Sequence, residues 1–150
     1  MTRALPITLT NMCMLTNDEG KILVENRLNP NWPGITFPGG HVEPKESLHD
    51  AVIREFKEET GLIISYPKLC GIKNFFDQEN NRYLVLLYQT NQFKGILKSS
   101  DEGNVFWINP DNLSNYKIAK GFDQIYRVFT NSKLSEVFMP DHNSWKTLLF

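Results

Sequence analysis

The sequence predicts a mixed α/β fold of the α+β type, in which helices cover both faces of a mixed central sheet in an α/β/α sandwich. Three observations predict it. Short apolar runs typical of strands alternate with turn-forming residues along most of the chain. One helix is expected early, at residues 47–60, and another late, at residues 118–130. With 150 residues, of which 41% are hydrophobic, residues 1–150 are expected to bury one core as a single domain.

The first part of the chain is expected to form two strands followed by a loop. The strands cover residues 8–16 and 21–27, and the turn Asn17-Asp18-Glu19-Gly20 joins them. Residues 28–40 are rich in Pro, Gly and Asn, which is typical of a loop. This loop is expected to pass through a short extended segment and to end at Pro38-Gly39-Gly40.

Residues 47–60 give the clearest helix prediction. Ser47 is a suitable N-cap, with Asp50 three residues later, and Gly61 stands where a left-handed C-cap is expected. The apolar residues of the first turns lie on one side and are expected to pack on the body of the protein: Leu48, Ala51 and Val52.

The rest of the chain is expected to contain more strands, the second helix and a closing hairpin. Strands are predicted over residues 62–65, 69–77, 82–90 and 105–108, with a turn at 78–81 and a polar loop at 99–104. Residues 110–113 begin a turn or short helix. The helix at 118–130 places its apolar residues on one side: Ile118, Phe122, Ile125, Tyr126 and Phe129. Residues 137–138 and 145–150 are expected to pair around Pro140-Asp141-His142-Asn143.

Composition excludes some classes of partner. The formal net charge of −1 argues against non-specific binding to nucleic acid or acidic membranes, because such binding needs a basic surface. Cys13 and Cys70 both lie in apolar stretches and are expected to be buried thiols in a reducing compartment. The first ten residues lack the apolar segment of a signal peptide, and no apolar run is long enough to span a bilayer. We therefore expect a cytoplasmic protein that binds no membrane.

Three glutamates share one face of the helix predicted at residues 47–60. Glu55, Glu58 and Glu59 are spaced i, i+3, i+4, on the side that the apolar residues of the first turns bury. The helix dipole disfavours the charge of Glu58 and Glu59 in the last turn, and the carboxylates repel one another. A divalent cation relieves both effects, and oxygen ligands suit Mg²⁺, with Mn²⁺ as a substitute. The alternative is a solvated, charged helix face without a ligand.

Residues 40–62 carry the pattern G-x5-E-x7-R-E-U-x-E-E-x-G-U, where U is apolar. This pattern resembles the Nudix box of the Nudix hydrolases at every defined position. The matching residues are Gly40, Glu46, Arg54, Glu55, Phe56, Glu58, Glu59, Gly61 and Leu62. The resemblance implies a loop–helix–loop whose glutamates bind the metal that holds a diphosphate, helped by a backbone carbonyl at Gly39 or Gly40.

The resemblance also assigns supporting roles. Glu46 and Arg54 are implied to support the site, with Arg54 orienting carboxylates by bidentate pairing. The alternative for Arg54 is an ordinary surface pair with Glu58. Many family members need a further acid beyond the box, and Glu102 resembles that residue, with Asp101 as its competitor. The general base is left open.

The resemblance is closest to the MutT-like branch, which hydrolyses oxidised purine nucleoside triphosphates such as 8-oxo-dGTP to the monophosphate and pyrophosphate. It rests on residues 35–43, on the short chain, and on Glu102 followed by Trp107. A nucleotide base needs stacking walls and edge hydrogen bonds. Stacking is expected from Trp32, Phe37, Phe75 and Trp107, and polar contacts from Arg27, Asn11 and Asn109. His41 is a candidate phosphate contact, and no metal is expected on His41, His49 or His142.

Three alternatives stay open at this point. One is a Nudix hydrolase for another diphosphate, such as ADP-ribose, although the proline expected of that branch is absent, because Pro67 lies too close to the box. Another is a non-catalytic module that senses a nucleotide, although all the box acids are present. The last is a structural domain with an acidic helix. A homodimer is also considered, since dimers are common in the family.

Overall fold

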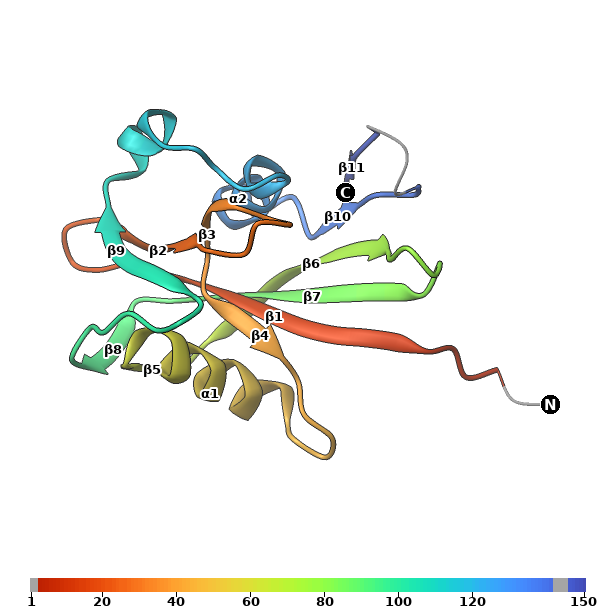
Figure 1. Cartoon of the computed structure of the whole chain (residues 1–150), viewed down its shortest axis with the longest axis horizontal. Helices are drawn as coiled ribbons and strands as arrows, with labels where there is room; N and C mark the ends of the chain where they lie inside the picture. The colour runs from red at the N-terminus through yellow and green to blue at the C-terminus, as the bar shows by residue number, and fades with distance from the viewer. Residues whose placement is uncertain (1–2, 142–145) are drawn as a thin grey trace.

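A six-stranded mixed sheet forms the centre of the structure, a computed structural model that describes residues 3–141 and 146–150 (Figure 1). Its strand order is β11-β10-β6-β7-β1-β4. The strands are β1 (Ile7–Leu15), β4 (Gly39–His41), β6 (Lys68–Phe76), β7 (Arg82–Thr90), β10 (Glu136–Phe138) and β11 (Leu148–Leu149). β1 is parallel to β7 and antiparallel to β4, so the predicted mixed sheet is confirmed.

Two smaller sheets flank the central one. The first has the order β3-β2-β9, with β3 (Gly34–Thr36), β2 (Ile22–Arg27) and β9 (Gly103–Ile108). The second pairs β5 (Leu62–Ser65) with β8 (Gln92–Gly95). A 3-10 helix, η1 (Pro110–Asn115), follows β9.

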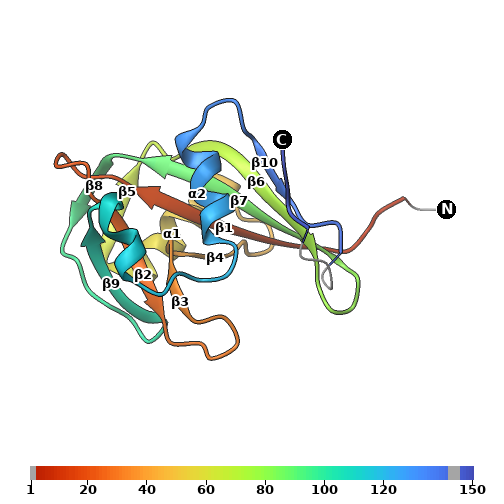
Figure 2. The ribbon, with the colours of Figure 1, turned by 90° about the horizontal axis from the view of Figure 1, so that it is seen from above.

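Two helices lie on opposite sides of the sheets: α1 (Leu48–Thr60) and α2 (Phe122–Thr130) (Figures 1 and 2). The core is therefore divided in two. One cluster packs under α2 and includes Phe37, Phe122 and Ile125. The other packs under α1 and includes Val52, Phe56 and Leu23. This arrangement confirms the predicted sheet between helices.

The ends of α1 follow the predicted capping. The Ser47 hydroxyl accepts a hydrogen bond from the Asp50 amide at 3.0 Å, and Gly61 adopts the left-handed conformation with φ of 76°. Ala51 and Val52 are buried as expected. Leu48 is 38% exposed, so its prediction was wrong, because the first turn of the helix extends past the edge of the core.

Three other details differ from the sequence predictions. α2 begins at Phe122 and not at Ile118, because Gly121 is left-handed and Ile118 forms a bridge with Ile35. Strand β8 was not predicted. All four of its residues are exposed, and Phe93 is its only large apolar residue, so the strand lacks the apolar pattern of a buried strand. The two strands joined by the turn at 17–20 enter different sheets and share only the bridge between Thr16 and Ile22.

The final hairpin and the cysteines are close to expectation. β10 and β11 pair antiparallel, whereas His142, Asn143 and Trp145 lie outside the described residues. Cys13 is a buried free thiol, and Cys70 is free but only half-buried. Within the described ranges, no helix is long and apolar enough to cross a membrane.

Candidate active site

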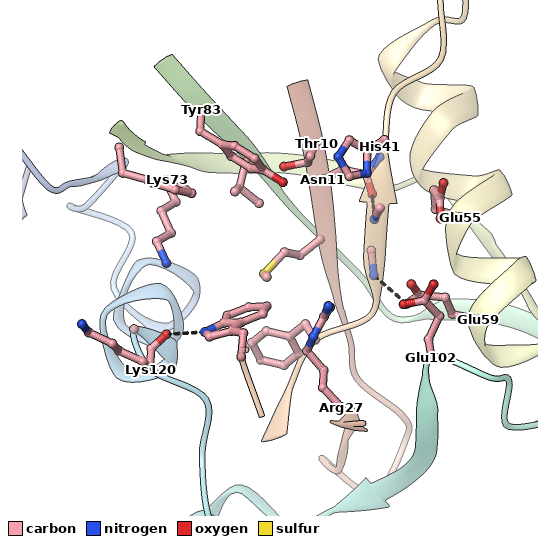
Figure 3. Close-up of a pocket in the computed structure, with 18 of the residues that line it drawn as sticks. Thr10, Asn11, Arg27, His41, Glu55, Glu59, Lys73, Tyr83, Glu102 and Lys120 are labelled. Carbon is pink, nitrogen blue, oxygen red and sulfur yellow. Dashed lines mark hydrogen bonds between the residues drawn. The ribbon is translucent and has the colours of Figure 1, made fainter. Parts of the chain in front are cut away.

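A cavity of about 540 Å³ opens between α1, the central sheet and the start of α2 (Figure 3). Carboxylates gather at one end, where Glu55, Glu59 and Glu102 lie together. Lys73 and Lys120 lie at the other end. Aromatic and apolar side chains form the walls between the two ends: Met12, Trp32, Phe37, Phe75, Tyr83, Val85 and Met139.

The glycines of β4 let α1 approach the cavity. The Gly39 amide donates a hydrogen bond to Glu59 Oε2 at 3.0 Å, and the Gly40 amide donates to Asn11 Oδ1 at 3.2 Å. A Cβ on Gly40 would lie 2.1 Å from Glu55 Oε2, and one on Gly39 would lie 1.9 Å from the Asn11 carbonyl oxygen. At Gly39 only glycine fits, because the clash is with backbone, whereas a Cβ on Gly40 would force the Glu55 carboxylate to move from its place.

Glu25 of β2 is an acidic residue of the site that the sequence analysis missed. It is completely buried, and neither carboxylate oxygen has a hydrogen-bond partner within the described part of the chain. The available signal was a glutamate directly after the buried run Ile22, Leu23, Val24, because an unpaired acid in an apolar strand is expensive.

Glu25 and Glu59 are the two acids of the site whose negative charge is most strongly disfavoured by their surroundings. Burial raises the pKa of Glu59 to about 9, with further contributions from the carboxylates of Glu25, Glu102 and Glu55. Burial likewise raises the pKa of Glu25 to about 7, Glu102 adds to the rise, and Arg27 opposes it. The raised pKa values of Glu25 and Glu59 favour the protonated form of the pair when no cation is bound.

Arg54 holds the entrance of the acidic end together. Its guanidinium donates to Glu46 at 2.7 and 2.9 Å, to Glu55 Oε1 at 2.9 Å and to the His41 carbonyl oxygen at 3.0 Å. The hydrogen bonds from Arg54 hold the pKa of Glu46 down to about 2. The Arg54 guanidinium therefore joins the segment before α1 to the helix itself. An isolated surface pair with Glu58, the alternative considered for Arg54, would not make this connection.

The three box glutamates are not equivalent. Glu59 is 5% exposed and the Glu55 side chain 16%, whereas the Glu58 side chain is 58% exposed. The expectation that Glu58 packs along the body was therefore wrong for this structure. Consecutive residues on a helix point about 100° apart, and Glu59 takes the inward direction. Glu58 instead lies 3.4 Å from the Arg54 guanidinium.

Of the two loop acids that compete beyond the box, Glu102 lines the cavity and Asp101 does not. The backbone explains the choice. The Glu102 carbonyl oxygen accepts from the Leu28 amide at 3.2 Å, which ties the start of β9 to the end of β2. Glu102 therefore stands beside Glu25 and Glu59.

The aromatic walls contain three of the four rings that the sequence suggested. Trp32 donates from its indole nitrogen to the Lys120 carbonyl oxygen at 3.0 Å, and the Arg27 guanidinium lies 4.8 Å from its ring centroid. Phe75 stacks on Tyr83 with centroids 4.7 Å apart. Phe37 is 2% exposed and belongs mainly to the core beneath α2.

Trp107 and Asn109, both predicted as substrate contacts, do not line the cavity. Side chains alternate along β9, and Trp107 faces the core under α1, where its ring lies 5.4 Å from that of Phe93. Asn109 caps η1 by accepting a hydrogen bond from the Asp111 amide at 3.0 Å.

Two further polar residues suggested by the sequence do reach the cavity. Asn11 is 3% exposed, and in the region that the structure describes its Nδ2 donor has no partner. His41, the last residue of β4, lines the rim of the cavity (Figure 3). Lys73, Tyr83 and Lys120 also line the cavity, and the sequence analysis missed them because each is separated from the box by many residues.

The acidic end has the donor chemistry of a divalent metal site. Across residues 3–141 and 146–150, no three His, Cys, Asp or Glu side chains already converge tightly enough to hold an ion. Yet the donors are all oxygens, two of them are buried without partners, and Gly40 leaves the backbone open beside Glu55. These features suit Mg²⁺ or Mn²⁺ rather than zinc, provided that the carboxylates draw together around the ion.

A carboxylate cluster at one end of an aromatic cavity, carried by a loop–helix–loop on a mixed sheet, is typical of enzymes that act on phosphate esters and anhydrides with a divalent metal. A family model described as NUDIX domain matches residues 7–129, and the chain belongs to this family of pyrophosphohydrolases. The "Uncharacterized Nudix hydrolase YvcI" of Bacillus subtilis is 29% identical over 114 residues, which are 73% of this chain and 70% of that protein.

Other relatives cover less of their own length. The "ADP-ribose pyrophosphatase" of Methanocaldococcus jannaschii is 31% identical over 90 residues, 59% of this chain and 53% of that protein. The "MutT-like protein" of Streptomyces ambofaciens is 27% identical over 103 residues, 67% of this chain and 63% of that protein. The chain thus spans between about half and 70% of these relatives.

Among solved structures, the MutT protein from Bacillus halodurans has the same fold. It matches with a TM-score of 0.77 and 23% identity, covering 95% of this chain and 97% of that one. The NUDIX domain of Shewanella oneidensis NrtR, solved with ADP ribose, matches with a TM-score of 0.70 and 19% identity, covering 86% and 88%. The MutT-like relatives and structures support the MutT-like branch.

Proposed function

We propose that this protein is a divalent-metal-dependent pyrophosphohydrolase that converts a nucleoside triphosphate to the monophosphate and pyrophosphate. The observation that carries the proposal is the pair of buried carboxyls, Glu25 and Glu59, at one end of a cavity whose middle is aromatic. Burying two neighbouring acids, of which Glu25 has no hydrogen-bond partner among the described residues and Glu59 accepts from the Gly39 amide, is unfavourable unless a cation joins them. The aromatic middle then has the size and shape for a nucleoside.

The reaction follows from charge. Water attacks the middle phosphorus, a new P–O bond forms, and the bridging oxygen leaves with the monophosphate. When bound, Mg²⁺ neutralises the phosphate oxygens and acidifies the attacking water. Glu55, Glu58, Glu59 and Glu102 are proposed to hold the ion together with a carbonyl at Gly39 or Gly40, and Glu25 joins them as an additional acid. One of these carboxylates accepts the proton of the water.

The remaining residues position the substrate. Arg54 and Glu46 keep Glu55 in place, as their hydrogen bonds support. Trp32 and Phe75 provide stacking faces, and Arg27 and the free amide of Asn11 are donors for substrate oxygens. His41, at the rim, is a donor for a phosphate.

Oxidised purine triphosphates such as 8-oxo-dGTP are the proposed preferred substrates, in line with the MutT-like branch. Relatives named for other activities supply the competing candidate substrates. They include an "ADP-ribose pyrophosphatase", the "CTP pyrophosphohydrolase" of Escherichia coli and an "RNA pyrophosphohydrolase" of Pseudomonas syringae. A nucleotide-sensing module without catalysis is the candidate from another class.

A substrate panel tests the proposal. The full chain with Mg²⁺ is assayed for kcat/KM on 8-oxo-dGTP, dGTP, CTP, ADP-ribose and 5′-triphosphorylated RNA, with Glu59→Gln as the inactive variant and Glu79→Gln, an exposed turn residue, as control. We expect Mg²⁺-dependent release of pyrophosphate from 8-oxo-dGTP, lost in Glu59→Gln alone. Equal rates on all five would contradict the oxidised-purine preference, and no turnover on any would contradict the enzyme.

A further inference from the structure

Lys73 is a buried cation that the proposed hydrolysis does not use. It lies in the middle of β6, is 8% exposed, and extends its ammonium into the cavity at the end opposite the carboxylates (Figure 3). Its Nζ lies 5.3 Å from the centroid of Phe75 and 5.9 Å from that of Trp32. In the portion of the chain that the structure describes, it makes no ion pair and donates no hydrogen bond.

The surroundings of Lys73 are unfavourable for a positive charge. Burial, with a contribution from Lys120, lowers its pKa to about 8. A Cβ on Gly121, the N-cap of α2, would lie 2.9 Å from Nζ, so the ammonium sits at the positive end of that helix. Cation–π contacts with Trp32 and Phe75 only partly offset the unfavourable burial of the Lys73 charge. A group with electron-rich acceptors, placed in the cavity, would supply the missing hydrogen bonds.

We propose that Lys73 is a specificity-determining residue, which donates to the carbonyl edge of the substrate's base and so selects guanine- and uracil-type bases over adenine- and cytosine-type bases. The inference rests on the proposed function for the identity of the ligand as a nucleotide. A lysine can donate to a carbonyl oxygen such as O6 of guanine. The amino group that adenine carries at the equivalent position is a donor and would leave both partners unsatisfied.

A base edge fits this end of the cavity better than a phosphate. The flat faces of Trp32 and Phe75 lie with their centroids 5.9 and 5.3 Å from Nζ, and Tyr83 stacks on Phe75. Aromatic faces attract rings and repel anions, because the face of the ring carries partial negative charge. The Trp32 ring is also held in place by its bond to the Lys120 carbonyl, so the slot keeps its shape.

Lys73→Met tests the role, since methionine keeps the length and apolar contacts of the side chain. Lys68→Met, at the exposed start of the same strand, is the matched control. With Mg²⁺, kcat/KM is measured for GTP, ATP, UTP and CTP. The wild type is expected to favour GTP over ATP and UTP over CTP by about tenfold or more, mainly through KM. Lys73→Met should bring both ratios to about one while leaving ATP unchanged, and Lys68→Met should keep the wild-type ratios.

Binding without turnover separates this proposal from the enzyme itself. NMR titrations of the metal-free protein with guanosine and adenosine, which carry no phosphate, should show a guanosine preference that Lys73→Met removes. If the preference is found but no nucleotide is hydrolysed, the proposed function fails and the role of Lys73 stands. The role is overturned if the wild type shows no preference, if Lys73→Met weakens all four bases equally, or if inorganic phosphate displaces guanosine only when Lys73 is present.

Discussion

The two ends of the cavity differ in how the chain builds them. The acidic end is mostly local, because Gly39 and Gly40 of β4 and Glu55 and Glu59 of α1 come from two elements that are consecutive in the chain. The opposite end is assembled from β6, β7 and the loops around Trp32 and Lys120, which are far apart in the sequence. We infer that the acidic end, which is built from consecutive elements, carries the chemistry that the family shares. The opposite end, which is built from distant segments, can vary between relatives and so determine which substrate binds.

The largest expected effect comes from the acidic end. Glu25→Gln keeps the shape of the side chain but removes the charge beside Glu59. Because an acid of the site is lost, kcat/KM should fall by about 10²–10⁴-fold while the fold is retained. Steady-state kinetics and circular dichroism together check this. Activity within a factor of about two of the wild type would show that Glu25 is only structural.

A smaller effect is expected at the aromatic end. Trp32→Leu removes the ring that the Lys120 carbonyl and Arg27 hold in position. Loss of one stacking face should raise KM by about tenfold and change kcat little, since the ring is proposed to stack on the base and not to contact the diphosphate. If kcat fell instead, with KM unchanged, the division of the cavity into a chemical and a recognition end would be wrong.

A third effect, on stability and not on catalysis, follows from the raised pKa values of Glu25 and Glu59. Both are raised above their unfolded values near 4.5, so the folded protein holds protons more tightly and is stabilised fully below that pH. This stabilisation is lost as pH rises through about 7 and 9, by at most about 1.4 kcal/mol per pH unit for one proton. In EDTA, Tm should therefore fall from pH 5 to 9.

The slope of Tm separates the buried acids from the exposed ones. Glu59→Gln should flatten it, and Glu79→Gln should follow the wild type. Differential scanning fluorimetry across the pH range is sufficient. A wild-type Tm that rises steadily over this range would mean that neither acid is protonated in the fold.

The sequence predicted α1, its caps and most strands, because these depend on local signals such as Ser47, Gly61 and the apolar runs around them. It also pointed to Glu59 and Glu102. It missed Glu25 and Lys73, whose importance comes from burial against partners distant in the chain. It misplaced Trp107 and Asn109, because an aromatic or amide side chain near the site cannot be assigned to one face of a strand before its pairing is known.

For Glu58, the sequence pattern and the position of the side chain in the structure disagree. Glu58 occupies a defined position of the box, yet its side chain lies mostly in solvent and contacts Arg54. Spacing alone placed it with Glu55, and only the packing of α1 on β4 distinguishes the two. Its proposed role as a ligand therefore requires its side chain to turn toward the cavity when an ion binds.

The most direct test of the central claim is calorimetric titration of the metal-free protein with Mn²⁺ at pH 7, repeated in buffers of different ionisation enthalpy. If Glu25 and Glu59 share a proton that the ion displaces, binding should release about one proton, and Glu59→Gln should weaken binding and abolish the release. Binding of equal strength in both proteins, or binding without proton release in the wild type, would contradict the account.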